Sequence, residues 1–257
     1  MNVTTSAQGT WLRSYHPTPE GRPRLVCFPH AGGSASFFFA FAKALAPSVE
    51  VLAVQYPGRQ DRRHEPCVDD LARLADEIAE IMPAWADRPP AFFGHSMGAT
   101  LAFEVALRLG ERPGAVGPSR LFVSGRRAPG RHRTETVHLR DDAGLIDELL
   151  LLNGTEPGVL LDDDVLRMVL PSLRADYRAI ERHVVRPGAR VDCPITVLVG
   201  DADPKVTVDE ARAWREHTTV GTADMSVFPG GHFYLNEHRP AVVDLITAAL
   251  LAPDASI

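Results

Sequence analysis

Short apolar runs recur along the chain, and segments with helical periodicity separate most of them. The runs are rich in β-branched or aromatic residues and lie at residues 24–28, 49–54, 91–93, 121–124, 195–200 and 225–228. Helical spacing of apolar residues is found at 37–46, 68–82, 99–109, 208–217 and 239–251. Runs that are apolar throughout are typical of strands covered on both faces. The pattern predicts an α/β fold, with a mostly parallel central sheet and helices on both faces.

The stretch between residues 124 and 195 interrupts this alternation, because it contains helix-like segments but no convincing strand. The segments lie at 143–152, 163–173 and 173–184. Asp162-Asp163-Asp164 is a typical helix start, and the first segment is richer in leucine than a solvent-facing helix requires. We expect a helical lid insertion at about residues 131–190 over an apolar pocket, in preference to an ordinary helical layer.

Length and composition predict one α/β domain over residues 1–257. Hydrophobic residues make up 45% of the chain and charged residues 23%, and the net charge of -6 gives no reason to expect nucleic acid or an anionic membrane as a partner. No apolar run approaches membrane-spanning length and no secretory leader is recognisable. We therefore expect a cytoplasmic protein.

The three cysteines, Cys27, Cys67 and Cys193, are odd in number and widely spaced. Neither a C-x-x-C pair nor a histidine cluster accompanies them, so the sequence supports neither a disulfide framework nor a zinc site. We expect no metal ion.

The pentapeptide Gly94-His95-Ser96-Met97-Gly98 lies between a predicted strand and a predicted helix. A serine that attacks a carbonyl group stands on such a tight strand-to-helix turn, and flanking glycines let strand and helix approach closely. The alternative is a Gly-Ser turn that only caps a helix. The context favours Ser96 as a nucleophile.

A serine nucleophile needs a base and an acid, and both are expected on loops at the carboxyl ends of later strands. His232 follows the last predicted strand in a glycine-rich loop and is the preferred base over His238, which lies at a helix start. Asp201 and Asp203 follow the preceding strand. Asp203 is favoured because a following proline keeps it extended, whereas Asp201 could accept backbone N–H groups of the turn.

The negative oxygen that forms during attack on a carbonyl needs two hydrogen-bond donors. One is expected to be the backbone N–H of Met97, directly after the nucleophile. The other is expected from the loop Phe28-Pro29-His30-Ala31-Gly32-Gly33, where we select the N–H of Ala31. A phosphate-binding loop is disfavoured here, because neither a P-loop lysine nor G-x-G-x-x-G spacing follows.

Taken together, these motifs resemble the stand-alone type II thioesterases of polyketide synthase and non-ribosomal peptide synthetase pathways. The matching segments are Cys27-Phe28-Pro29-His30-Ala31-Gly32-Gly33, Gln55-Tyr56-Pro57-Gly58-Arg59, the Gly94–Gly98 motif, Gly200-Asp201-Ala202-Asp203-Pro204 and Gly230-Gly231-His232-Phe233. The resemblance extends from about residue 24 to about residue 250.

This resemblance implies an α/β-hydrolase fold with a helical lid, a Ser96, Asp203 and His232 triad, and an oxyanion hole of Ala31 and Met97. It implies hydrolysis of misloaded acyl groups from the phosphopantetheine arm of acyl or peptidyl carrier proteins, with no cofactor. A carboxylesterase, an acyltransferase and a non-catalytic hydrolase-like binding protein are the alternatives. A monomer is favoured, since no long exposed apolar stripe stands out.

Two further expectations concern the substrate. Carrier proteins of this type are acidic, so the group Arg126, Arg127, Arg131 and Arg133 is a candidate docking surface, with a solvated loop as the alternative. Together with the lid, Phe37, Phe38 and Phe39 are expected to shape the pocket that sets acyl length.

Overall fold

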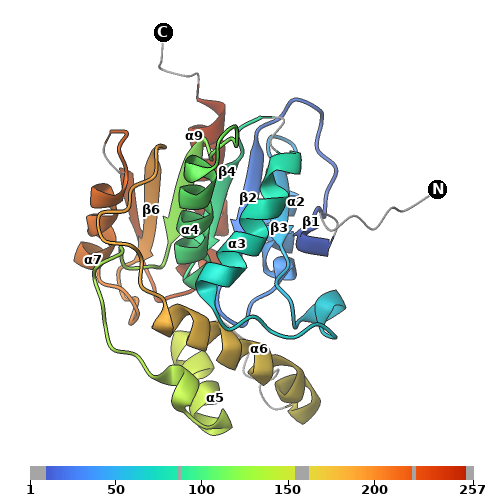
Figure 1. Cartoon of the computed structure of the whole chain (residues 1–257), viewed down its shortest axis with the longest axis vertical. Coiled ribbons are helices and arrows are strands. Elements are labelled where there is room, and N and C mark those ends of the chain that lie inside the picture. Colours follow the sequence, from blue (N-terminus) through green and yellow to red (C-terminus); the bar gives the residue numbers. More distant parts are fainter. Residues whose placement is uncertain (1–9, 86–87, 154–161, 222–223, 253–257) are drawn as a thin grey trace, which may run out of the picture.

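The computed structural model describes residues 10–85, 88–153, 162–221 and 224–252, and its centre is a seven-stranded sheet (Figure 1). The strand order is β1-β3-β2-β4-β5-β6-β7, in which β1 pairs antiparallel with β3 and all other pairs are parallel. The strands are β1 (Leu12–Arg13), β2 (Arg24–Phe28), β3 (Glu50–Val54), β4 (Ala91–His95), β5 (Arg120–Ser124), β6 (Ile195–Gly200) and β7 (Asp224–Phe228). Six of these strands were predicted; β1 has two residues, too few for a recognisable apolar run.

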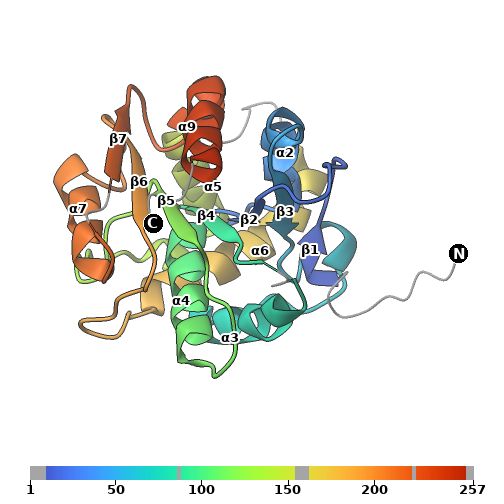
Figure 2. The ribbon, with the colours of Figure 1, turned by 90° about the horizontal axis from the view of Figure 1, so that it is seen from above.

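Helices cover both faces of the sheet, as predicted. Figure 2 shows α2 and α9 on one face and α3 and α4 on the other. The α-helices are α2 (Phe39–Leu45), α3 (Leu71–Ile81), α4 (Met97–Glu111), α5 (Asp142–Leu152), α6 (Asp163–Arg182), α7 (Val208–Arg212), α8 (Tyr234–Glu237) and α9 (Arg239–Leu251). Short 3-10 helices occupy Ala35–Phe38, Gln60–Arg62, Met82–Trp85, Val137–Leu139 and Ala213–His217.

The sheet separates two hydrophobic clusters. Every residue of β2, β4 and β6 is buried, because each of these strands has a neighbour on both sides and helices on both faces. One cluster packs α3, α4 and α6 against the sheet, and the other packs α2 and α9. This explains why the strands appear in the sequence as continuous apolar runs rather than alternating ones.

Several helices differ in extent from the predicted ranges. The segment 68–82 becomes a helix only at Leu71, because the side chain of Asp70 accepts the N–H of Arg73 and starts α3 there. The segments 37–46 and 208–217 each divide into an α-helix and a 3-10 helix. The predicted break near Leu173 is wrong, since α6 runs unbroken from Asp163 to Arg182.

The helix α6 continues through Pro171, although proline lacks the backbone N–H and crowds the preceding turn. Its buried face, which includes Leu170, Leu173, Tyr177 and Ile180, packs in the cluster that contains α3 and α4. Burial of this apolar stripe stabilises the continuous helix despite the proline.

The helices α5 and α6 lie between β5 and β6 in the sequence, and both lie at one end of the sheet (Figure 1). They fall within the predicted insertion at residues 131–190. Residues 154–161, part of that insertion, lie outside the described residues.

Within the described part of the chain, no helix has the length and apolar character needed to cross a membrane. Cys27, Cys67 and Cys193 are free thiols. The described residues contain no cluster of three potential metal ligands.

Candidate active site

Ser96 lies on a strained turn between β4 and α4. Its φ of 55° is in the left-handed region that a residue with a side chain seldom adopts. Gly94 and Gly98 make the turn possible: a Cβ on Gly94 would lie 2.2 Å from the carbonyl oxygen of Gly98, and one on Gly98 would lie 2.0 Å from that of Phe28. The two glycines are therefore required by close backbone approach, as the motif predicted.

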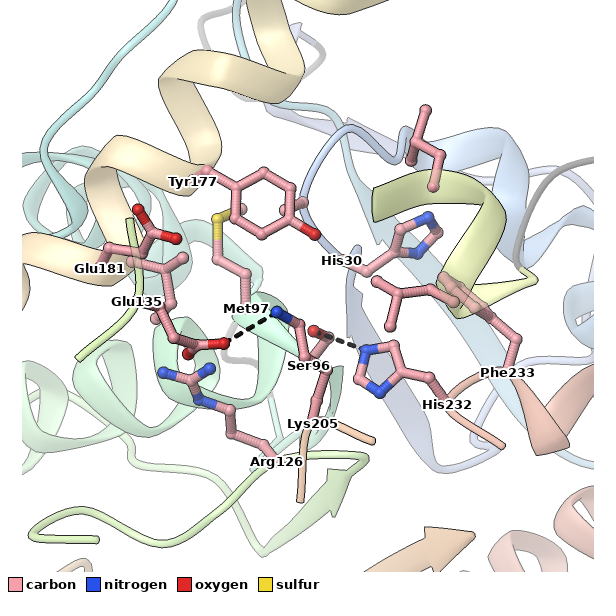
Figure 3. Close-up of a pocket in the computed structure, with 14 residues that line it drawn as sticks. His30, Ser96, Met97, Arg126, Glu135, Tyr177, Glu181, Lys205, His232 and Phe233 are labelled. Atoms are coloured by element: carbon pink, nitrogen blue, oxygen red, sulfur yellow. Dashed lines mark hydrogen bonds and ion pairs between the residues drawn. The ribbon is translucent and has the colours of Figure 1, made fainter. Parts of the chain in front are cut away.

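The side chains of Ser96, His232 and Asp203 form a continuous chain of hydrogen bonds (Figure 3 shows the contact between Ser96 and His232). The Ser96 Oγ lies 2.9 Å from Nε2 of His232, and Nδ1 of His232 lies 2.8 Å from Oδ2 of Asp203. The imidazole and the carboxylate are 2% and 0% exposed. With the proton on Nδ1, His232 can accept the serine proton at Nε2.

The two alternative residues make other contacts. The carboxylate of Asp201 accepts the backbone N–H of Gly230 at 2.9 Å, so it satisfies a donor of the neighbouring loop as the sequence suggested. His238 lies immediately before α9, and its Nε2 hydrogen-bonds the carbonyl oxygen of Pro229. Neither side chain is hydrogen-bonded to His232 or Ser96.

The N–H groups of Ala31 and Met97 have no acceptor among the described residues, and both residues line the pocket that contains Ser96. Met97 is the first residue of α4, where backbone N–H groups have no partner within the helix. A hydrogen bond of 3.0 Å from the Tyr56 hydroxyl to the carbonyl oxygen of Pro29 ties down the loop that carries Ala31. Two free donors therefore border the cavity beside the serine.

The cavity beside Ser96 has a volume of about 40 Å³, and the inserted helices form part of its wall. The helices α5 and α6 contribute Leu149, Leu152, Tyr177, Ile180 and Glu181. Phe37, Phe38 and Phe39 do not line it, which corrects the prediction: Phe38 is buried in the core, Phe39 is exposed, and Phe37 packs on His30 and Phe233 behind the wall.

Charged groups that sequence reasoning missed also line this cavity (Figure 3). Burial alone would raise the pKa of Glu135, but hydrogen bonds from Lys205 and Arg127 lower it to about 2. Lys205 also contacts Glu148 of α5 at 2.5 Å. These partners come from separate loops and helices, so no local motif could have indicated them.

The four arginines proposed as a carrier-docking surface do not form a free basic patch. Arg127 is buried against Glu135, while Arg131 pairs with Glu216 at 3.1 Å and Arg133 with Glu210 at 2.5 Å. Arg126 lines the active-site cavity, and burial, followed by the nearby charge of Arg127, lowers its pKa to about 10. The sequence did not reveal these acidic partners, because they lie elsewhere in the chain. Docking of a carrier protein at this surface stays a prediction.

Two further histidines lie beside His232, of which His95 is buried and His30 is half-buried. Burial, with a smaller effect from the charge of His232, lowers the pKa of His30 to about 3 and that of His95 well below its ordinary value. The Nδ1 of His95 lies 3.0 Å from the Ser124 hydroxyl, which in turn contacts the Tyr234 hydroxyl at 2.7 Å. Both imidazoles are therefore neutral at neutral pH and do not compete with His232 as a base.

These two histidines predict that the free energy of unfolding falls as the pH drops below 6.5. The unfolded chain then takes up protons that the folded chain cannot, which costs up to about 1.4 kcal/mol per pH unit for each histidine. The loss continues down to the folded pKa, about 3 for His30. Glutamine in place of His95 can still hydrogen-bond Ser124 but cannot take up a proton on unfolding. The His95→Gln variant should therefore show a smaller change of the unfolding free energy with pH than the wild type. Urea unfolding at pH 7, 6 and 5 measures it, and a slope equal to that of the wild type would contradict the expectation.

The sequence as a whole matches known thioesterases. A family model described as "Thioesterase domain" matches residues 23–250. The chain is 55% identical over 250 residues to a probable cadicidin biosynthesis thioesterase of Streptomyces griseus, covering 96% of this chain and 68% of that protein. It is 48% identical over 254 residues to the thioesterase PikA5 of Streptomyces venezuelae, covering 97% and 90%.

Solved structures agree with this assignment. The type II thioesterase BorB from the borrelidin biosynthetic cluster superimposes with a TM-score of 0.87 at 50% identity, over 94% of this chain and 98% of that one. The RedJ thioesterase of the prodiginine pathway in Streptomyces coelicolor gives a TM-score of 0.84 at 38% identity, over 93% and 90%. The chain therefore belongs to the thioesterase domain family and is a hydrolase of thioesters built on the α/β-hydrolase fold.

Proposed function

We propose that this enzyme is a type II thioesterase of polyketide or non-ribosomal peptide biosynthesis. It hydrolyses misloaded acyl groups from the phosphopantetheine arm of acyl or peptidyl carrier proteins and so restores stalled carriers. The observation that carries the proposal is the hydrogen-bonded chain of Ser96, His232 and Asp203 beside a cavity walled by α5 and α6. The similarity to BorB and PikA5 supports the substrate class.

In the first half-reaction, the Ser96 hydroxyl transfers its proton to Nε2 of His232 as its oxygen attacks the thioester carbonyl. Asp203 accepts the hydrogen bond from Nδ1 and stabilises the imidazolium. The N–H groups of Ala31 and Met97 hold the negative oxygen of the tetrahedral intermediate. The carbon–sulfur bond then breaks, and the pantetheine thiol departs with the proton from His232, which leaves an acyl ester on Ser96.

In the second half-reaction, water is the nucleophile and the Ser96 oxygen is the leaving group. His232 takes a proton from a water molecule, the hydroxide oxygen attacks the acyl-Ser96 ester, and the proton returns to the Ser96 oxygen as the free acid leaves. A thiol has a pKa near 8.5, far below that of an alcohol, so thiolate departure in the first half needs little acid assistance. No step requires a cofactor or a metal ion.

We further propose that the whole chain acts as one catalytic domain in which residues 131–190 form a lid. A cavity of about 40 Å³ holds only a few water-sized groups. We expect the lid to open for entry of an acyl-pantetheine arm and to close again before the reaction. The monomeric state and the cytoplasmic location expected from the sequence stay predictions.

Matched substrates test this function against its alternatives. We expect the enzyme to hydrolyse a short acyl thioester with a higher kcat/KM than the oxygen ester of the same acyl group. Higher activity on the oxygen ester would indicate a carboxylesterase. Transfer of the acyl group to an alcohol or amine in place of free acid would indicate an acyltransferase.

A further inference from the structure

A buried ion pair connects α6 to the loop that follows β3. The guanidinium of Arg59 contacts both carboxylate oxygens of Asp176, with Nη1 at 2.6 Å from Oδ2 and Nη2 at 2.9 Å from Oδ1. The two side chains are 6% and 1% exposed. Bidentate pairing of this kind fixes the relative orientation of both groups. The residues are 117 positions apart, and the pair is one of the contacts that join the inserted helices to the core.

Both members of this pair also hold the loop after β2, which carries Ala31. Oδ2 of Asp176 accepts the N–H of Gly32 at 2.8 Å, and Nη1 of Arg59 donates to the carbonyl oxygen of Gly33 at 3.0 Å. The peptide group that joins Ala31 to Gly32 is thus held in place by Asp176. The N–H of Ala31 itself belongs to the preceding peptide group and is free beside the cavity.

The loop and α6 also pack tightly at this point. Gly32 has a φ of +73°, and a Cβ there would lie 2.7 Å from Cδ1 of Leu173 on α6. The side chain of Gln55 adds a further tie, since it donates to the carbonyl oxygen of Arg59 and accepts the N–H of Ala35. Arg59 and Asp176 are therefore part of one rigid junction between the loop, the strand β3 and the helix α6.

Stability alone does not account for a pair buried to this degree. Desolvation of two charges offsets much of their attraction, and apolar residues of similar volume are commonly as stable or more stable. The pair does, however, supply two directed hydrogen bonds to the loop, which apolar residues could not make. The stabilisation that a hydrogen-bond donor gives to an oxyanion falls strongly when the donor is displaced.

We propose that Arg59 and Asp176 are positioning residues that set the Ala31 N–H for oxyanion binding and couple its position to α6. The inference rests on the proposed function, because it assigns the pair to the reaction at Ser96. The helix α6 then both forms a wall of the acyl cavity and supports the loop that carries Ala31. Contact between α6 and this loop therefore places the Ala31 N–H for oxyanion binding.

The test replaces the pair by apolar residues of similar size, in the double variant Arg59→Met and Asp176→Leu. We expect kcat for a small acyl thioester to fall roughly 10- to 100-fold with KM unchanged, because the donor is misplaced in the transition state while the cavity remains. The concentration of reactive Ser96 is determined by complete titration with a fluorophosphonate, and kcat is calculated from that concentration. Unfolded protein in the sample then does not lower the measured kcat. Arg59→Lys keeps the charge but loses the bidentate contact, and we expect a smaller fall in kcat. If the double variant does not fold, the kcat of Arg59→Lys alone tests the proposal.

The control is Glu104→Gln, which disrupts another buried ion-paired carboxylate. Glu104 of α4 bonds His183, the residue after α6, at 2.8 Å, and so anchors the same helix away from the oxyanion loop. We expect its kcat per reactive serine to equal that of the wild type. An unchanged kcat in both Arg59 variants, or an equal fall in the control, overturns the proposal. Failure of the wild type itself to hydrolyse the thioester through Ser96 would instead overturn the proposed function.

Discussion

Replacing Ser96 by alanine is expected to lower kcat for thioester hydrolysis by about 10³-fold or more. The substitution removes the oxygen that attacks the carbonyl, and His232 and Asp203 cannot act on the substrate without it. Only transition-state contacts from the donors at Ala31 and Met97 would remain. Steady-state hydrolysis of an acyl N-acetylcysteamine thioester measures the loss.

Two measurements distinguish loss of the nucleophile from loss of the folded structure. The melting temperature of Ser96→Ala should match that of the wild type, because the variant keeps a non-glycine residue at φ 55° and leaves the glycines of the turn in place. A fluorophosphonate should add its mass to the wild type at Ser96 and leave the variant unmodified. Full activity in the variant would remove Ser96 from the mechanism.

Replacing Asp203 by asparagine is expected to lower kcat by about 10⁴-fold. An asparagine amide in this position donates to Nδ1 of His232, which moves the ring proton to Nε2. That nitrogen then faces the Ser96 hydroxyl at 2.9 Å as a donor and can no longer accept its proton. The kcat of the purified variant, measured with the same thioester, provides the test.

Asp201→Asn is the matched control, since Asp201 lies on the same loop but contacts the Gly230 N–H. An asparagine oxygen can still accept that hydrogen bond, so we expect kcat near that of the wild type. A large loss in Asp201→Asn together with a small loss in Asp203→Asn would reverse the assignment of the acid.

The parts of the fold that the sequence predicts are those determined by local rules. Continuous apolar runs identify the parallel strands because both faces of the sheet are covered. The turn at Ser96 is recognisable because Gly94 and Gly98 lie where backbone segments come within 2.2 Å and 2.0 Å of any added Cβ. Asp203 and His232 could be selected because parallel strands bring their carboxyl ends to one edge of the sheet.

The parts that the sequence does not predict depend on distant partners. Arg127, Arg131 and Arg133 read as a basic group, but glutamates from several segments pair with them. The ion pair of Arg59 and Asp176 joins residues 117 positions apart, and no periodicity indicates it. The helix α6 continues through Pro171 because its apolar face is buried, which local propensity does not reveal.

Intact-protein mass spectrometry of loaded carrier domains shows whether this enzyme removes acyl groups from phosphopantetheine. Carriers bearing different acyl groups on phosphopantetheine are incubated with the wild-type enzyme or with Ser96→Ala. We predict that the wild type converts the acylated carrier to the free-thiol form with release of the free acid, while the variant leaves the acyl mass unchanged. Acylated carriers that keep their mass with the wild-type enzyme, while it hydrolyses small oxygen esters, would contradict the account.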